Sequence, residues 1–151
     1  DVSTTAARLE GYRAAMHDAG IPESDHFEVP SGFLREPGYQ SAMMTFSGNP
    51  QSAPTAVFAC NDLCAAGALQ ALSELGISVP DEVSIVGFDD TPFSASLQPP
   101  LTTIRMPIQE MGSLAVELLV NIIEDRQPTT RQHCLPVSLT LRSSTSTSPK
   151  T

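Results

Sequence analysis

The sequence predicts an α/β fold built around a mostly parallel sheet. Residues 55–60 and 83–88 are two runs that are apolar throughout, without the alternation of a half-exposed strand, as is typical of strands covered on both faces. The stretch between them, residues 63–75, has the spacing of a helix and is followed by Gly76. A strand, a helix and a strand at this spacing form a right-handed βαβ unit.

The remaining elements follow from local periodicity and from turn-forming residues. Helices are expected over residues 4–19, 38–47 and 108–126, and strands over residues 26–29, 102–105 and 133–141. Ser3 or Thr4 can cap the first helix, and Gly20 ends it. The apolar surface of the helix over 108–126 is wider than one stripe, which indicates packing on two sides or in a subunit interface.

The two ends of the chain carry expectations of their own. Residues 143–151 are low in complexity and are expected to be a disordered tail. The first helix begins almost at once, without the strand that normally precedes such a helix in an α/β fold. We therefore expect the chain to be a fragment of a longer protein.

Composition disfavours several classes of function. The 151 residues suit one domain, and the net charge is -9 with a single lysine, Lys150, so this chain alone is not expected to bind DNA phosphates. No apolar run approaches the ~20 residues that span a bilayer, and no leader is recognisable, so we expect a cytoplasmic protein without membrane contact. The three cysteines complete no zinc-binding set and are expected to be reduced, buried thiols, with no metal and no cofactor.

Polar pairs follow both predicted core strands: Asn61 and Asp62 after the first, Asp89 and Asp90 after the second. The carboxyl ends of parallel strands meet at one edge of a sheet, where ligands bind in such folds. Asp62 stands at the N-cap position of the next helix, which leaves the amide of Asn61 free. Asp90 precedes Thr91 and a proline and can be a cap as well, which leaves Asp89 as the acid that faces a ligand.

These pairs do not build a recognisable catalytic centre. A phospho-receiver pocket needs further carboxylates and a lysine near the phosphoryl group, and no third acid ends a predicted strand. The sequence contains no Gly-x-Ser-x-Gly elbow and no glycine-rich phosphate loop, and no histidine stands beside an obvious nucleophile. We therefore do not expect an enzyme.

Three stretches resemble the effector-binding domain of the lactose-repressor/galactose-repressor family of bacterial transcription regulators. They are PTAVFACNDLCAAGALQALSELGISVPDEVSIVGFDDTPFSASLQPPLTTIRMP (residues 54–107), ARLEGYRAAMHDAGI (residues 7–21) and LPVSLTLRSST (residues 135–145). The resemblance implies the fold of periplasmic sugar-binding proteins, with two α/β lobes and the ligand between them. Residues 1–142 would be the C-terminal part of that domain, a three-layer parallel-sheet lobe truncated at its N-terminus. Residues 105–126 would cross to the missing N-terminal lobe.

The resemblance implies a ligand-sensing domain of a DNA-binding transcriptional regulator, expected to be a repressor. Its effector would be a sugar or a nucleoside, and it would control operator binding allosterically. The operator would be bound through a headpiece absent from this chain, and the intact protein would be a homodimer. The alternative that stays open at this point is the solute-binding component of a sugar transporter.

The resemblance also implies which side chains contact the effector: Thr4, Arg8, Phe33, Asn61 and Asp89. A carboxylate and a guanidinium together suit the vicinal hydroxyls of a sugar, because both make directional, charge-assisted hydrogen bonds. The ring of Phe33 would cover the apolar face of a sugar or a base. The alternatives are that Arg8 pairs with a surface acid such as Glu36 and that Phe33 packs in the core.

Overall fold

The computed structural model describes residues 2–49, 52–126, 130 and 132–147. At its centre is a four-stranded sheet in the order β1 (Ala56–Phe58), β2 (Ser84–Asp89), β3 (Thr102–Arg105) and β4 (Ser138–Thr140). The first three strands are parallel, and β4 runs antiparallel to β3. The predicted α/β fold with a mostly parallel sheet is confirmed.

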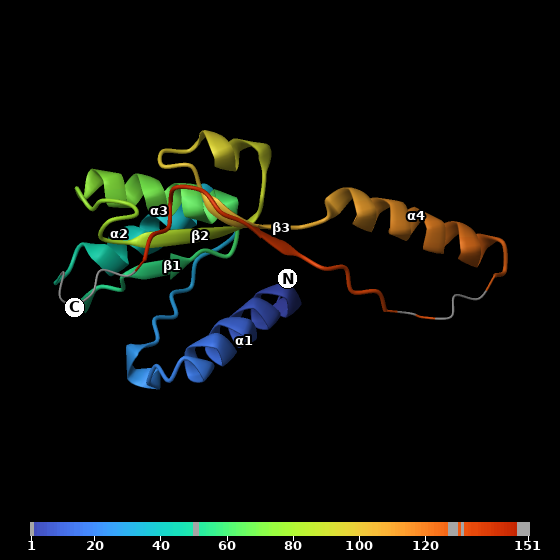
Figure 1. Cartoon of the computed structure of the whole chain (residues 1–151), viewed down its shortest axis with the longest axis horizontal. Helices are drawn as coiled ribbons and strands as arrows, with labels where there is room; N and C mark the ends of the chain where they lie inside the picture. The colour runs from blue at the N-terminus through green and yellow to red at the C-terminus, as the bar shows by residue number, and fades with distance from the viewer. Residues whose placement is uncertain (1, 50–51, 127–129, 131, 148–151) are drawn as a thin grey trace.

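Two helices, α2 (Arg35–Phe46) and α3 (Asp62–Glu74), lie together over one face of the sheet (Figure 1). They approach each other closely because Gly67 of α3 faces the backbone of α2, where a Cβ atom would collide with the carbonyl of Arg35. The core lies between these helices and the sheet. Its fully buried apolar side chains include Leu72, Ile85 and Leu101.

The opposite face of the sheet is covered only loosely. Helix α1 (Val2–Asp18) lies on this side, below the sheet in Figure 1. Side chains alternate between the two faces of a strand, and Phe58 and Phe88 point toward α1. Phe58 remains 43% exposed and borders a cavity of about 900 Å³ between α1 and β1. The layers are therefore helix, sheet and helix pair, with one loosely packed layer.

Helix α4 (Ile108–Ile123) projects away from the rest of the chain (Figure 1), and none of its residues is buried. Ile108, Val116, Ile122 and Ile123 are each at least 60% exposed. The broad apolar surface that the sequence predicts is thus uncovered by the described residues. None of the helices described combines the length and the apolar character needed to cross a bilayer.

Several predicted elements differ from the observed ones. Residues 26–29 are irregular rather than a strand: they pair with none of the four strands of the sheet, and a strand needs a partner ladder. β1 is shorter than predicted and is not covered on both faces, since α1 stands away from it. The last strand spans only Ser138–Thr140. Helix α1 begins at Val2, so Thr4 lies within the helix and does not cap it.

The predicted disorder from Ser143 onward is wrong for the first residues of that segment. Ser144 is fully buried, and its hydroxyl donates to the carbonyl of Ile85 at 2.6 Å and accepts from the amide of Thr102 at 2.8 Å. The amide of Ile85 donates in turn to the carbonyl of Ser144 at 2.8 Å. The composition of residues 143–151 cannot predict these hydrogen bonds, because the partners lie about 40 to 60 residues away in the chain. Residues 148–151 lie outside the described residues.

Candidate functional site

Four polar residues, Asn61, Asp62, Asp89 and Asp90, stand at the carboxyl ends of β1 and β2, and we call this edge the polar rim. Asn61 is the N-cap of α3: its Oδ1 accepts from the amide of Cys64 at 2.9 Å. Its Nδ2 donates to the carbonyl of Phe33 at 2.9 Å. The sequence predicted that Asp62 is the cap and that the Asn61 amide is free, and both predictions are wrong. The oxygen and the nitrogen of the Asn61 amide can each still make one further hydrogen bond.

Asp62 is a structural acid inside the fold. It is fully buried, and its carboxylate accepts from the amide and the hydroxyl of Thr91, both at 2.7 Å, and from the hydroxyl of Thr103 at 2.6 Å. These bonds fasten the start of α3 to the segment after β2 and to β3. Its position shortly after β1 did not predict this role, because its partners Thr91 and Thr103 come from distant parts of the sequence.

Asp90 is also fully engaged within the protein. Its carboxylate accepts from Arg105 Nε at 2.5 Å and from Arg142 Nη2 at 2.6 Å. Burial opposes ionisation of Asp90, but the hydrogen bonds from the two arginines outweigh burial and lower its pKa. The N-cap position of the following short helix belongs to Thr91, so Asp90 is not the cap that the sequence suggested.

Asp89 differs from its neighbours, because its carboxylate makes no hydrogen bond or salt bridge with any residue that the structure describes. Burial raises the pKa of Asp89, the charge of Arg8 opposes this, and the charge of Asp62 adds to it. The backbone of Asp89 has a φ of 110°, a conformation that non-glycine residues rarely adopt. A strained acid without a protein partner at a strand end is poised to receive donors from a ligand.

Arg8 reaches the polar rim from α1. Its Nη1 donates to the carbonyl of Cys60 at 2.7 Å, and its guanidinium carbon lies 4.0 Å from the ring centroid of Phe88. The side chain is thereby fixed between the residues that precede Asn61 and Asp89. Pairing with Glu36 is not observed, since the carboxylate of Glu36 accepts from Gln40 instead. Most of the guanidinium donors of Arg8 are left for another partner.

The two other predicted contact residues are Thr4 and Phe33. Thr4 is exposed and lies one turn before Arg8 in α1. Phe33 is 39% exposed, so core packing does not account for it, and its carbonyl is held by Asn61. The structure thus brings Arg8, Asn61 and Asp89 to one edge of the sheet, with the backbone of Phe33 bound to Asn61. Thr4 is connected to this cluster only through its place in α1, one turn before Arg8.

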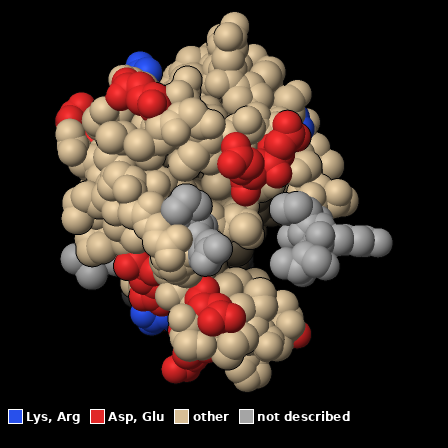
Figure 2. Space-filling view, turned by 90° about the vertical axis from the view of Figure 1, so that its left-hand side faces the viewer, with Lys and Arg blue, Asp and Glu red and all other residues tan. Residues whose placement is uncertain are grey.

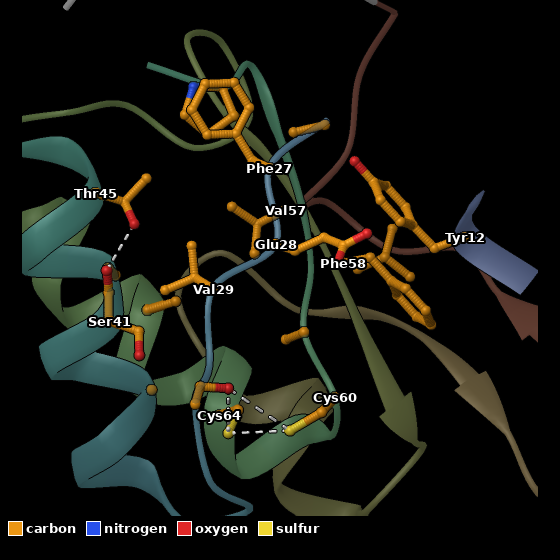
Figure 3. Close-up of a pocket in the computed structure, with 18 of the residues that line it drawn as sticks. Tyr12, Phe27, Glu28, Val29, Ser41, Thr45, Val57, Phe58, Cys60 and Cys64 are labelled. Carbon is orange, nitrogen blue, oxygen red and sulfur yellow. Dashed lines mark hydrogen bonds between the residues drawn. The ribbon is translucent and has the colours of Figure 1, made fainter. Parts of the chain in front are cut away.

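The cavity between α1 and β1 is a separate feature (Figure 3). Tyr12 of α1 and Phe58 of β1 stand on one side, Ser41 and Thr45 of α2 on the other, and Cys60 lies near the bottom of the view. The lining includes Arg8 and Phe33 but not Thr4, Asn61 or Asp89. Its surface is mainly apolar, as in a protein core, and sugar hydroxyls would leave their hydrogen bonds unmade there. We therefore place the candidate site at the polar rim.

One cluster was not expected from the sequence. The sulfurs of Cys60 and Cys64 lie 3.3 Å apart, and Ser31 lies within 4.0 Å of both. Cys134 is exposed and Cys60 is only partly buried, so the expectation of three buried thiols holds for Cys64 alone. The spacing of Cys60 and Cys64 around the start of a helix could have predicted this pair. The residue before an N-cap and the third residue of the helix lie on the same side of the first turn.

Metal and nucleic-acid sites find no support in the described parts of the chain. No group of three or more histidine, cysteine or acidic side chains is arranged to hold a metal ion in those parts. Figure 2 shows one face of the molecule, with acidic side chains in several places and few basic atoms.

Comparison with known proteins connects this geometry to a family. Residues 1–145 match the model of the periplasmic binding protein-like domain. The ribose operon repressor of Escherichia coli K12 is 39% identical over 138 residues, which are 91% of this chain and 41% of that protein.

Two solved structures have the same fold. The LacI family transcriptional regulator from Enterococcus faecium with bound ribose matches with a TM-score of 0.84 at 34% identity, over 93% of this chain and 51% of that one. The lac repressor dimer bound to operator and the anti-inducer ONPF matches with a TM-score of 0.82 at 29% identity, over 94% of this chain and 48% of that one. The chain spans about half the length of these proteins or less. It belongs to the family of periplasmic binding protein-like domains, in the form that LacI-family regulators carry.

Proposed function

We propose that the chain is the C-terminal part of the effector-binding domain of a DNA-binding transcriptional repressor, and that its effector is a sugar or a nucleoside. The observation that carries the proposal is the carboxylate of Asp89. Of the three acids at the polar rim, Asp62 and Asp90 are fully engaged within the protein, and Asp89 has no hydrogen-bonding partner among the described residues. A ligand rich in hydroxyl donors supplies what this acid lacks.

The chemistry of the surrounding groups agrees with such a ligand. The carboxylate of Asp89 accepts from two adjacent hydroxyls, and the remaining donors of Arg8 reach ligand oxygens. The ring of Phe33 covers an apolar face of a sugar or a base, and Thr4 and the uncommitted positions of Asn61 add neutral hydrogen bonds. The ribose in the Enterococcus faecium structure and the name of the ribose operon repressor favour pentoses among the candidates.

Signal transmission requires parts of the protein beyond these residues. We propose that residues 105–126, including the exposed helix α4, cross to a second lobe, and that the effector bridges the two lobes. A coupling free energy of about 1–3 kcal/mol between effector and operator changes operator affinity by roughly 5- to 150-fold. We further propose that the intact protein is a cytoplasmic homodimer that contacts its operator through a headpiece outside this chain. The lac repressor dimer bound to operator supports the dimer and the DNA contact.

The comparisons do not favour the alternative that the chain is part of a sugar transporter. The related proteins named above are transcriptional regulators, and none is a transporter subunit or an enzyme.

The test is direct binding to the full-length protein. Calorimetric titration with ribose, other pentoses, hexoses and nucleosides is expected to identify at least one ligand. That ligand should change the affinity of the protein for the DNA upstream of its own gene in a mobility-shift assay. Failure of every panel member to bind, together with failure to bind that DNA in any state, would contradict the proposal.

A further inference from the structure

Cys60 and Cys64 form a paired-thiol site at the end of β1. Cys60 is the residue before the N-cap of α3, and Cys64 is the third residue of that helix. Their sulfurs are 3.3 Å apart. The carbonyl of Gly32 lies within hydrogen-bonding distance of both thiols, at 3.2 Å from Cys60 Sγ and 2.7 Å from Cys64 Sγ. The hydroxyl of Ser31 lies 4.0 Å and 3.8 Å from the two sulfurs.

The two thiols differ in access and in acidity. Both residues border the cavity beside α1, but Cys60 is partly exposed, whereas Cys64 is buried. The hydrogen bond between the sulfurs lowers the pKa of Cys60 to about 6, against the effect of burial, and Ser31 and the charge of Arg8 act in the same direction. The same hydrogen bond, together with burial, raises the pKa of Cys64. Cys60 is therefore the reactive thiolate, and Cys64 is its neighbouring thiol.

We propose that Cys60 and Cys64 are a redox modification site, at which a peroxide converts the two thiols into a reversible disulfide. In the first step the thiolate of Cys60 attacks one peroxide oxygen. A sulfur–oxygen bond forms, the oxygen–oxygen bond breaks, and the leaving oxygen takes a proton to become water or an alcohol. Cys60 is then a sulfenic acid.

In the second step the sulfur of Cys64 attacks the oxidised sulfur of Cys60. The sulfur–sulfur bond forms, the sulfur–oxygen bond breaks, and the departing hydroxide takes the proton of Cys64 and leaves as water. Two thiols lose two electrons in total, and the peroxide gains them. The sulfurs must close from 3.3 Å to about 2.0 Å.

Disulfide formation removes a hydrogen bond that holds the neighbouring loop. A disulfide carries no S–H group, so the carbonyl of Gly32 loses the hydrogen bond from the Cys64 thiol. The adjacent Phe33 belongs to the proposed effector site, and the carbonyl of Cys60 positions Arg8. Oxidation is therefore expected to weaken effector binding, a consequence that rests on the proposed function.

The disulfide itself is tested without reference to any effector. The full-length protein is treated with hydrogen peroxide, its remaining thiols are alkylated, and it is denatured and cleaved before aspartate. Cleavage between Asn61 and Asp62 places the two cysteines on separate peptides, which stay together only if a disulfide joins them. The linked pair is expected at low peroxide and should disappear on reduction with dithiothreitol.

The variants keep side-chain size nearly constant. Cys64→Ser should leave Cys60 as a sulfenic acid that dimedone traps, whereas Cys134→Ser, at an exposed position, should form the linked pair as the wild type does. Full alkylation of both thiols after peroxide treatment, or a sulfinic acid at Cys60 without linked peptides, would overturn the proposal.

A second measurement tests the coupling to the effector site. Titration of reduced and oxidised protein with the sugars and nucleosides of the panel should give an affinity about tenfold lower in the oxidised state, restored by dithiothreitol. Cys64→Ser should show no such difference. Equal affinities in both states would refute the coupling. If no panel member binds in either state, the proposed function fails, and the linked peptides still decide whether the redox site exists.

Discussion

Replacing Asp89 by asparagine should abolish most of the effector affinity without weakening the fold. Asparagine is preferred to alanine for this test, because it tolerates the positive φ of 110° at this position. One charge-assisted hydrogen bond to a hydroxyl is lost outright, about 1.5–3 kcal/mol, and the second becomes a neutral bond, about 1 kcal/mol weaker. The sum corresponds to a loss of roughly two to three orders of magnitude in affinity.

The stability of this variant provides an internal check. The pKa of Asp89 is raised by burial, so the ionised carboxylate opposes folding at neutral pH, and stability falls as pH rises through that pKa. Asp89→Asn should therefore leave the melting temperature unchanged or slightly higher. Asp81 is an exposed acid in the turn before β2, and Asp81→Asn should change neither the effector affinity nor the melting temperature.

Calorimetry with the best ligand of the panel and thermal unfolding are the two assays. An affinity for Asp89→Asn within threefold of the wild type would refute the assignment of Asp89 to the effector. A large drop in melting temperature would refute the view that its carboxylate has no structural partner.

Further substitutions test the other parts of the site and the fold. Arg8→Lys should weaken effector binding by about tenfold in the same calorimetric assay, because an ammonium cannot bond Cys60 and a ligand with the geometry of the guanidinium fork. Effector affinity should fall on acidification with a midpoint above the ordinary aspartate value of 3.8, since the pKa of Asp89 is raised; a midpoint below that value would contradict this. Asp62→Asn should lower the free energy of unfolding by about 1–3 kcal/mol in urea, because a fully buried acceptor of three hydrogen bonds loses its charge. Gly67→Ala should cost about 1–3 kcal/mol or more in the same measurement, because the added methyl collides with the backbone of α2; an unchanged midpoint would show that the two helices can separate.

Much of the fold was predictable because its signals are local. The apolar run before Asp89 predicted β2, and the pattern between Asn61 and Gly76 predicted α3, each to within about a residue. Residues 26–29 have the composition of a strand but form none, because strand formation needs a partner ladder and these residues pair with none of the four strands. Periodicity reports which residues suit a strand and cannot report whether a neighbouring strand is present.

The sequence alone also placed two polar pairs at the ends of adjacent strands, since parallel strands end at the same edge of a sheet. It did not determine which of those polar groups is left without a partner. Asp62 is satisfied by Thr103, 41 residues away, and Asp90 by Arg142, 52 residues away. Only the tertiary structure brings such distant donors together. For that reason it alone distinguishes the acids that hold the fold from Asp89, whose carboxylate accepts no hydrogen bond from the described residues.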